Sequence, residues 1–167
     1  MGYLRKLLVA SVGAVSLIGA AGVSAGAHDR DTLVEFSSMT PVTGSAVGTV
    51  NHRGITGGGL PWAIKSGRGE VDRQGNIELK VKGLVIPVTP FNGTNPVAQM
   101  AATLSCLTPN GIVNVSTLPQ TFPADAAGDV TIVGSVKVPH PCREPIVFVT
   151  SPGGAWFAKS SSDEAGD

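Results

Sequence analysis

The sequence predicts an all-β protein: a two-sheet β-sandwich of about eight to nine short strands, carrying one disulfide bond. Three observations predict it. Residues 76–82 alternate apolar Ile77, Leu79 and Val81 with charged side chains, and a period of two places the two sets on opposite faces of a strand. Further runs rich in Val, Ile and Thr follow at short intervals. The chain's 22 glycines and 12 prolines separate these runs with turn signals.

The strand-like segments can be read in chain order. They are expected at 32–36, 49–53, 62–65, 69–73, 76–82, 84–88, 97–107, 112–117, 130–138, 146–150 and 155–158. The turn at 73–76 should join its neighbouring segments as an antiparallel hairpin, and Asn110-Gly111 should do the same for the segments around it. Pro87 and Pro90 favour an edge position for 84–88.

Segment 97–107 allows two interpretations. Asn95 followed by Pro96 has the form of a helix N-cap with proline at the first helical position. However, alternate residues from Ala98 to Cys106 are all apolar or sulfur-bearing, as on one face of a strand. We favour the strand and keep the helix as the alternative.

The cysteine count and the tryptophans bear on the architecture. Cys106 and Cys142 are the only cysteines, and in an exported protein such a pair predicts a disulfide. We favour a sandwich over a closed barrel, with an immunoglobulin-like topology as one candidate. Trp62 and Trp156 lie outside the interval between the cysteines, whereas an immunoglobulin domain has a tryptophan within it. Any such likeness is therefore expected to be architectural only.

The start of the chain predicts export. Arg5 and Lys6 precede an uncharged apolar run, and Ala25 and Ala27 supply the small residues of a cleavage site. We expect a signal peptide over 1–27, a single β-sandwich domain over 28–159 and a flexible acidic tail over 160–167. The expected location is secreted or extracellular, including association with the cell envelope, with no membrane span after cleavage.

Charge excludes several partner classes. The chain has 12 basic and 12 acidic residues, and loss of Arg5 and Lys6 leaves 10 against 12, a net charge of −2. No block of like charge is present, so neither nucleic acid nor an anionic membrane surface is an expected partner.

Catalytic and metal motifs are also missing from the pattern, so no catalytic residue, metal or cofactor is expected. His28, His52 and His140 are scattered rather than closely spaced. A secreted hydrolase is the alternative function, using His140 with Glu144 or the hairpin carboxylates Glu70, Asp72 and Glu78. Asp125 and Asp129 flank a loop, but two carboxylates fall short of a calcium site.

The favoured function is that of a non-catalytic extracellular binding or envelope-associated module, and any binding is expected in its loops, since sites on rigid sandwiches are usually placed there. The candidate residues are Gly57, Gly58, Gly59 and Trp62 in one loop, and Asn92 and Asn95 in another. The partner would be an extracellular protein or a glycan. Trp62, Trp156 and Phe157 are expected mainly in the core rather than on a sugar-stacking platform. Asn92 and Asn114 open glycosylation sequons, whose use depends on the host.

A set of short segments carries a resemblance. These are Gly58-Gly59-Leu60-Pro61-Trp62, Gly83-Leu84-Val85, Gly93-Thr94-Asn95-Pro96-Val97, Ser105-Cys106, Pro141-Cys142 and Gly154-Ala155-Trp156-Phe157-Ala158. In them the chain resembles a group of secreted bacterial proteins of uncharacterised activity. The resemblance implies no activity and no functional residue.

Overall fold

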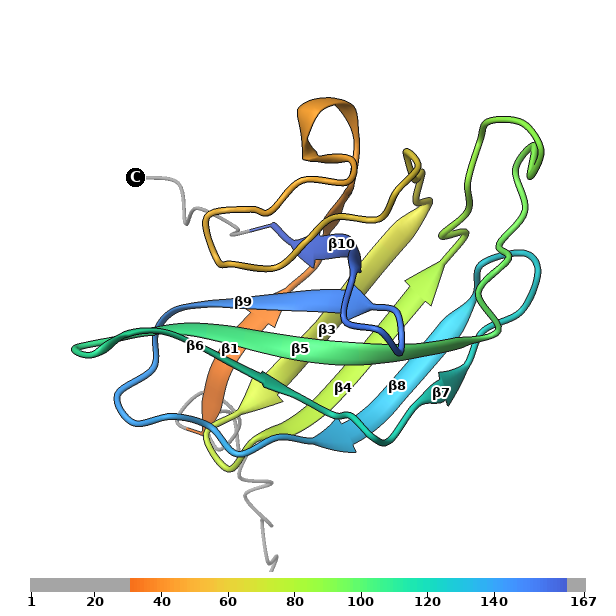
Figure 1. The fold of residues 1–167 in the computed structure, drawn as a ribbon. Helices are drawn as coiled ribbons and strands as arrows, with labels where there is room; N and C mark the ends of the chain where they lie inside the picture. Colours follow the sequence, from red (N-terminus) through yellow and green to blue (C-terminus); the bar gives the residue numbers. More distant parts are fainter. Residues whose placement is uncertain (1–30, 162–167) are drawn as a thin grey trace, which may run out of the picture.

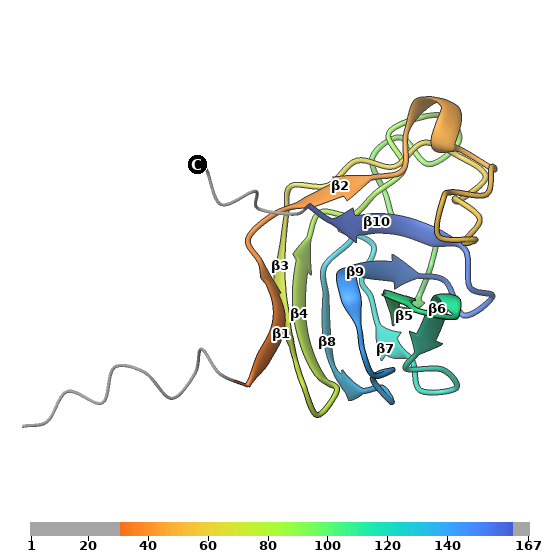
Figure 2. The same ribbon diagram turned by 90° about the vertical axis from the view of Figure 1, so that its left-hand side faces the viewer.

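Two antiparallel sheets packed face to face make up the computed structural model, which describes residues 31–161 (Figure 1). Sheet I has the order β1 (Thr32–Phe36), β3 (Ser66–Asp72), β4 (Asn76–Lys82), β8 (Val130–Ser135). Sheet II has the order β2 (Met39–Pro41), β10 (Trp156–Ser160), β9 (Arg143–Thr150), β5 (Gln99–Thr108), β6 (Gly111–Ser116), and β7 (Phe122–Pro123) also pairs with β5. One 3₁₀ turn, η1, spans Gly44–Ala46. Figure 2 views the two layers edge-on.

The predicted all-β sandwich and its disulfide are confirmed. Cys106 on β5 bonds Cys142, which directly precedes β9. Because β5 and β9 are neighbours in sheet II, the bond joins two strands of one sheet. In an immunoglobulin domain the disulfide joins the two sheets, so the likeness is one of architecture.

The β3–β4 hairpin is confirmed, with β4 at the predicted residues 76–82. Its strands pair from Ser66 opposite Lys82 to Val71 opposite Ile77. Gly75 has φ +95°, and a Cβ there would lie 1.9 Å from the carbonyl oxygen of Val136. Glycine is therefore required both by the turn and by the chain that crosses it.

Segment 97–107 is a strand, and the helix alternative is excluded. β5 pairs with β6 on one side and β9 on the other. Asn95 does accept a hydrogen bond from the backbone N–H of Val97 (2.9 Å), as a cap would, but its Nδ2 donates to Val97 O and Asp125 O. The side chain holds two loops together instead of starting a helix.

Three predicted strands were wrong. Segments 49–53, 62–65 and 84–88 make only isolated bridges, such as Ala63 with Val85. They belong to two long connections, 42–65 and 83–98, which lie together at one end of the sandwich in both views (Figures 1 and 2). β2 and β7 were missed because three and two residues are too few to show a period.

The expected domain boundaries fall near the limits of the described chain. The signal peptide predicted at 1–27 lies outside the described residues, as do 162–167 of the predicted tail. β10 continues to Ser160, whose Oγ accepts a hydrogen bond from Val147 N–H (3.0 Å). No helix within 31–161 has the length and apolar character needed to span a bilayer.

Candidate functional site

Sheet II is covered on its outer face by the chain's own connection. Segment 51–58 crosses it: Asn114 Nδ2 donates to Arg53 O (2.8 Å), and Trp156 N–H donates to Thr56 O (2.9 Å). Phe148 lies on this outer face, because its neighbours Val147 and Val149 pair with the core residues of β5. Phe148 is nevertheless fully buried. The covered face of sheet II therefore offers little surface to a partner.

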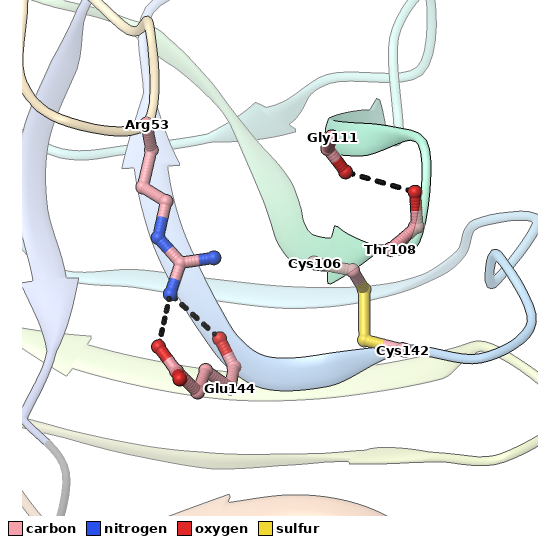
Figure 3. The surroundings of a disulfide bond; sticks show 6 residues. All are labelled: Arg53, Cys106, Thr108, Gly111, Cys142 and Glu144. Carbon is pink, nitrogen blue, oxygen red and sulfur yellow. Dashed lines mark hydrogen bonds and ion pairs between the residues drawn. A yellow bond between two sulfur atoms is a disulfide. The ribbon is translucent and has the colours of Figure 1, made fainter.

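Arg53 is the buried charge under this connection (Figure 3). Its side chain is 3% exposed, and Nη2 donates to the backbone carbonyl of Glu144 at 2.9 Å and lies 3.5 Å from the Glu144 carboxylate. Nε and Nη1 have no hydrogen-bond partner among the described residues. A buried, incompletely paired guanidinium stabilises little, and its hydrogen bond to Glu144 joins the connection to β9.

The first predicted binding loop is largely packed inward. A Cβ on Gly57 would lie 2.2 Å from Ala46 O, and one on Gly58 would lie 2.9 Å from Trp62 Nε1. Trp62 is 3% exposed and stacks on Phe157 with ring centroids 4.2 Å apart. Gly59 is exposed. Binding through this loop stays a prediction, in which Trp62 offers no exposed ring.

The second predicted loop has one exposed and one buried asparagine. Asn92 lies at an exposed turn with φ 48°, and its Nδ2 donates to Pro90 O (3.2 Å). Asn95 is buried, with the three hydrogen bonds described above. Asn95 thus fixes the base of the loop, whereas Asn92 lies where a partner could reach it. Binding by this loop also stays a prediction.

The candidate catalytic groups lie in two parts of the fold: His140 before β9 with Glu144 within it, and the hairpin carboxylates Glu70, Asp72 and Glu78, of which Glu70 and Glu78 lie directly opposite each other. His140 is exposed, and the Glu144 carboxylate lies beside Arg53. Partial burial raises the pKa of the Asp72 carboxyl, but hydrogen bonds from Asn76 and the turn backbone outweigh it and leave the pKa below its ordinary value. A general acid needs a raised pKa. Within 31–161, no three His, Cys, Asp or Glu residues group as metal ligands.

Asp125 and Asp129 are engaged within their loop. Asp125 Oδ1 accepts the N–H of Asp129 (2.9 Å), while the Asp129 carboxylate accepts from Lys82 Nζ (2.7 Å) and Gly83 N–H (2.9 Å). The Lys82 hydrogen bond, followed by that of Gly83, lowers the pKa of Asp129, and the same contact raises the pKa of Lys82. The two directions agree, and both describe an ion pair that ties the loop to β4.

The outer face of sheet I, in contrast, has charges sorted by sign. Glu35 on β1 lies directly opposite Glu70 on β3, and Glu70 lies opposite Glu78 on β4. We call these three residues the acidic row. Two positions further along the strands, on the same face, Arg68 lies opposite Lys80, and we call this pair the basic row. An acidic row therefore lies beside a basic row, and Lys80 Nζ bridges them by a 2.9 Å contact with Glu78.

This face is also hollowed. Three hollows of ≈ 410, ≈ 540 and ≈ 550 Å³ lie along it, and their linings include both rows. Val133, on β8 opposite Glu78, is 62% exposed and lines the third hollow. No described element packs over the face, which forms the open side of the sheet I layer in Figure 2.

Sequence reasoning found part of this surface. The alternation in 76–82 placed Glu78 and Lys80 on the solvent side, and the spacing of Glu70 and Asp72 gave them a common face. It missed Glu35 and Arg68. The hairpin register could have indicated Arg68, because the turn at 73–76 fixes which residues are opposite. Glu35 comes from a strand distant in sequence, and no local signal indicated it.

No family model, curated protein or solved structure matches this chain. The resemblance to secreted bacterial proteins therefore stays a prediction.

Proposed function

We propose that the chain is a non-catalytic extracellular binding module that holds a protein partner on the outer face of sheet I. The disulfide supports an oxidising compartment outside the cytosol. The largely covered face of sheet II and the open, hollowed face of sheet I support the choice of surface.

The observation that carries the proposal is the sorting of charge. Like charges directly opposite each other in an antiparallel sheet are destabilising. The face holds three such pairs: Glu35–Glu70, Glu70–Glu78 and Arg68–Lys80. A merely solvated face gains nothing from this arrangement, whereas a binding face gains electrostatic complementarity to a partner.

The chemistry favours a protein partner over a glycan. Sugar rings are commonly held on flat aromatic faces, but Trp62, Trp156 and Phe157 are all buried. Two adjacent rows of opposite sign, beside exposed Val133, match a partner surface that carries a basic strip next to an acidic one. The sorted pattern, rather than net charge, would give the specificity.

A pair of synthetic peptides tests this. One has a block of lysines followed by a block of glutamates, and the other alternates the same residues. At an ionic strength of about 0.01 M, where screening is weak, titration should show the block peptide binding at least about fivefold more tightly, a difference of roughly 1 kcal/mol. Equal binding of the two peptides, or no binding of either, would contradict the proposal.

Matched variants then locate the site. Glu70→Gln and Lys80→Gln each remove one charge from a row, and each should abolish the preference for the block peptide. Glu144→Gln and Lys137→Gln remove one charge of each sign elsewhere on the exposed surface and should retain it. If the two control variants lose the preference equally, the binding reflects net charge and the sheet I face is not the site.

A further inference from the structure

β6 is an edge strand with an open side. Thr117 N–H donates to Ala102 O (2.9 Å), and the register continues through Val115–Leu104 and Val113–Cys106. Hydrogen-bonded pairs alternate along an antiparallel ladder. Ile112, Asn114 and Ser116 therefore direct their backbone N–H and C=O groups away from β5, where no strand of the described chain pairs with them.

The other three sheet edges are protected. β1 carries Glu35 and a register shift, and β2 has three residues ending in Pro41. β8 lies against β7. Charge, irregularity, proline, short length and cover are the usual means of preventing strand addition. β6 has none of these: its sequence is Gly-Ile-Val-Asn-Val-Ser, Ile112 is 44% exposed, and its hairpin turn stands out from the body in Figure 1.

We propose that β6 pairs antiparallel with β6 of a second copy, forming a two-fold symmetric dimer with a continuous sheet. Pairing centred on Asn114 places Ile112 opposite Ser116 of the second copy, and Asn114 opposite its own equivalent. All the outward N–H and C=O groups of these three residues then bond, two per pair. The same register places Val113 opposite Val115 on the core side, so the apolar row of sheet II continues across the interface.

Symmetry and charge argue for a second copy as the occupant. A strand that pairs with itself about a two-fold axis makes a closed interface in which each contact occurs twice. β6 contains no charged residue, so two copies meet without repulsion. The inference does not involve the sheet I face and is independent of the proposed binding function.

Sedimentation velocity of the mature full chain, from about 1 µM to about 1 mM, is the test. We expect a reversible monomer–dimer equilibrium with no larger species. Asn114→Lys places two ammonium groups opposite each other across the axis and should weaken the dimer about fivefold. Asn114→Ala also loses the bond to Arg53 O but adds no charge, so it should dimerise like the wild type.

Two further variants keep the outcome clear. Ile112→Pro removes an N–H that the monomer does not use, so it should remain folded by circular dichroism and lose dimerisation. Val50→Lys adds a charge at a 65% exposed site outside β6 and should not affect it. A chain that stays monomeric throughout, a wild type that forms open-ended oligomers, or a dimer that survives both Asn114→Lys and Ile112→Pro would each overturn the proposal.

Discussion

Opening the Cys106–Cys142 bond should lower the free energy of unfolding by about 3.8 kcal/mol. The two cysteines are 36 residues apart in sequence. For a loop of about that length, the loss of loop entropy in the unfolded chain is about 13 cal/mol/K, which gives about 3.8 kcal/mol at 25 °C. This is a large share of the 5–15 kcal/mol typical of a domain. The reduced protein should therefore be only marginally stable.

Reduction and substitution probe the bond differently. Reduction keeps both sulfur atoms, so it isolates the loop term. Cys106→Ala with Cys142→Ala also removes a sulfur from a fully buried position at Cys106, and this cavity should add about 1 kcal/mol. The double variant is thus expected to be somewhat less stable than the reduced wild type.

Urea unfolding followed by circular dichroism measures the effect. Because Cys106 is buried, the bond must be reduced in the unfolded chain, which is then refolded under reductant. The midpoint should fall, and the slope should rise slightly because the unfolded chain without the bond exposes more surface. The melting temperature should fall by about 10–20 °C. Equal midpoints for the oxidised and reduced proteins would refute the reasoning.

Three other predictions follow from individual contacts. Gly128→Ala would place a Cβ 2.2 Å from the backbone oxygen of Leu84 at φ +80° and should lower the free energy of unfolding by at least about 3 kcal/mol. Gly93→Ala has a similar φ of +90° but lies in open space, so it should cost only about 1 kcal/mol. Equal losses of the two variants in urea unfolding would contradict the predicted clash. Asp129→Asn should lower the melting temperature at pH 7. Because the pKa of Asp129 is lowered in the fold, the stability that its carboxylate contributes is present above the ordinary pKa of 3.8 and is lost as pH falls through the folded pKa. The difference in melting temperature between this variant and the wild type should therefore disappear in acid, and Lys82→Met should behave in the same way. Arg53→Ala should lower the free energy of unfolding by about 3 kcal/mol because it leaves a void. Arg53→Met fills most of that space and removes two unpaired polar atoms, so it should cost at most about 1 kcal/mol. An Arg53→Met variant as unstable as Arg53→Ala would show that the charge itself is required.

Local pattern was sufficient where strand pairing is local. The alternation in 76–82 and the glycine turn before it predicted β4 and its hairpin, because neighbouring strands joined by a tight turn have few alternative registers. Segment 97–107 was harder, since Asn95-Pro96 suits a helix start as well. Pairing with β6 and β9 decided it, and β9 lies about 40 residues away in the chain.

The wrong strands show the limit of the same reasoning. Segments 49–53 and 84–88 have strand-like residues, but a strand also needs a partner along several residues. Each makes only isolated bridges. Arg53 is a related case: nothing in Asn51-His52-Arg53-Gly54 indicated burial, which follows from the loop crossing sheet II.

The sequence by itself determined the all-β class, the β3–β4 hairpin and the disulfide pair, because alternation, turn residues and cysteine count act over short distances or leave one pairing. Only the tertiary structure decided which face stays open, that Glu35 joins Glu70 and Glu78 in one row, and that β6 is left as an unprotected edge. These depend on contacts between segments far apart in the chain, whose register is set by packing both sheets around one core.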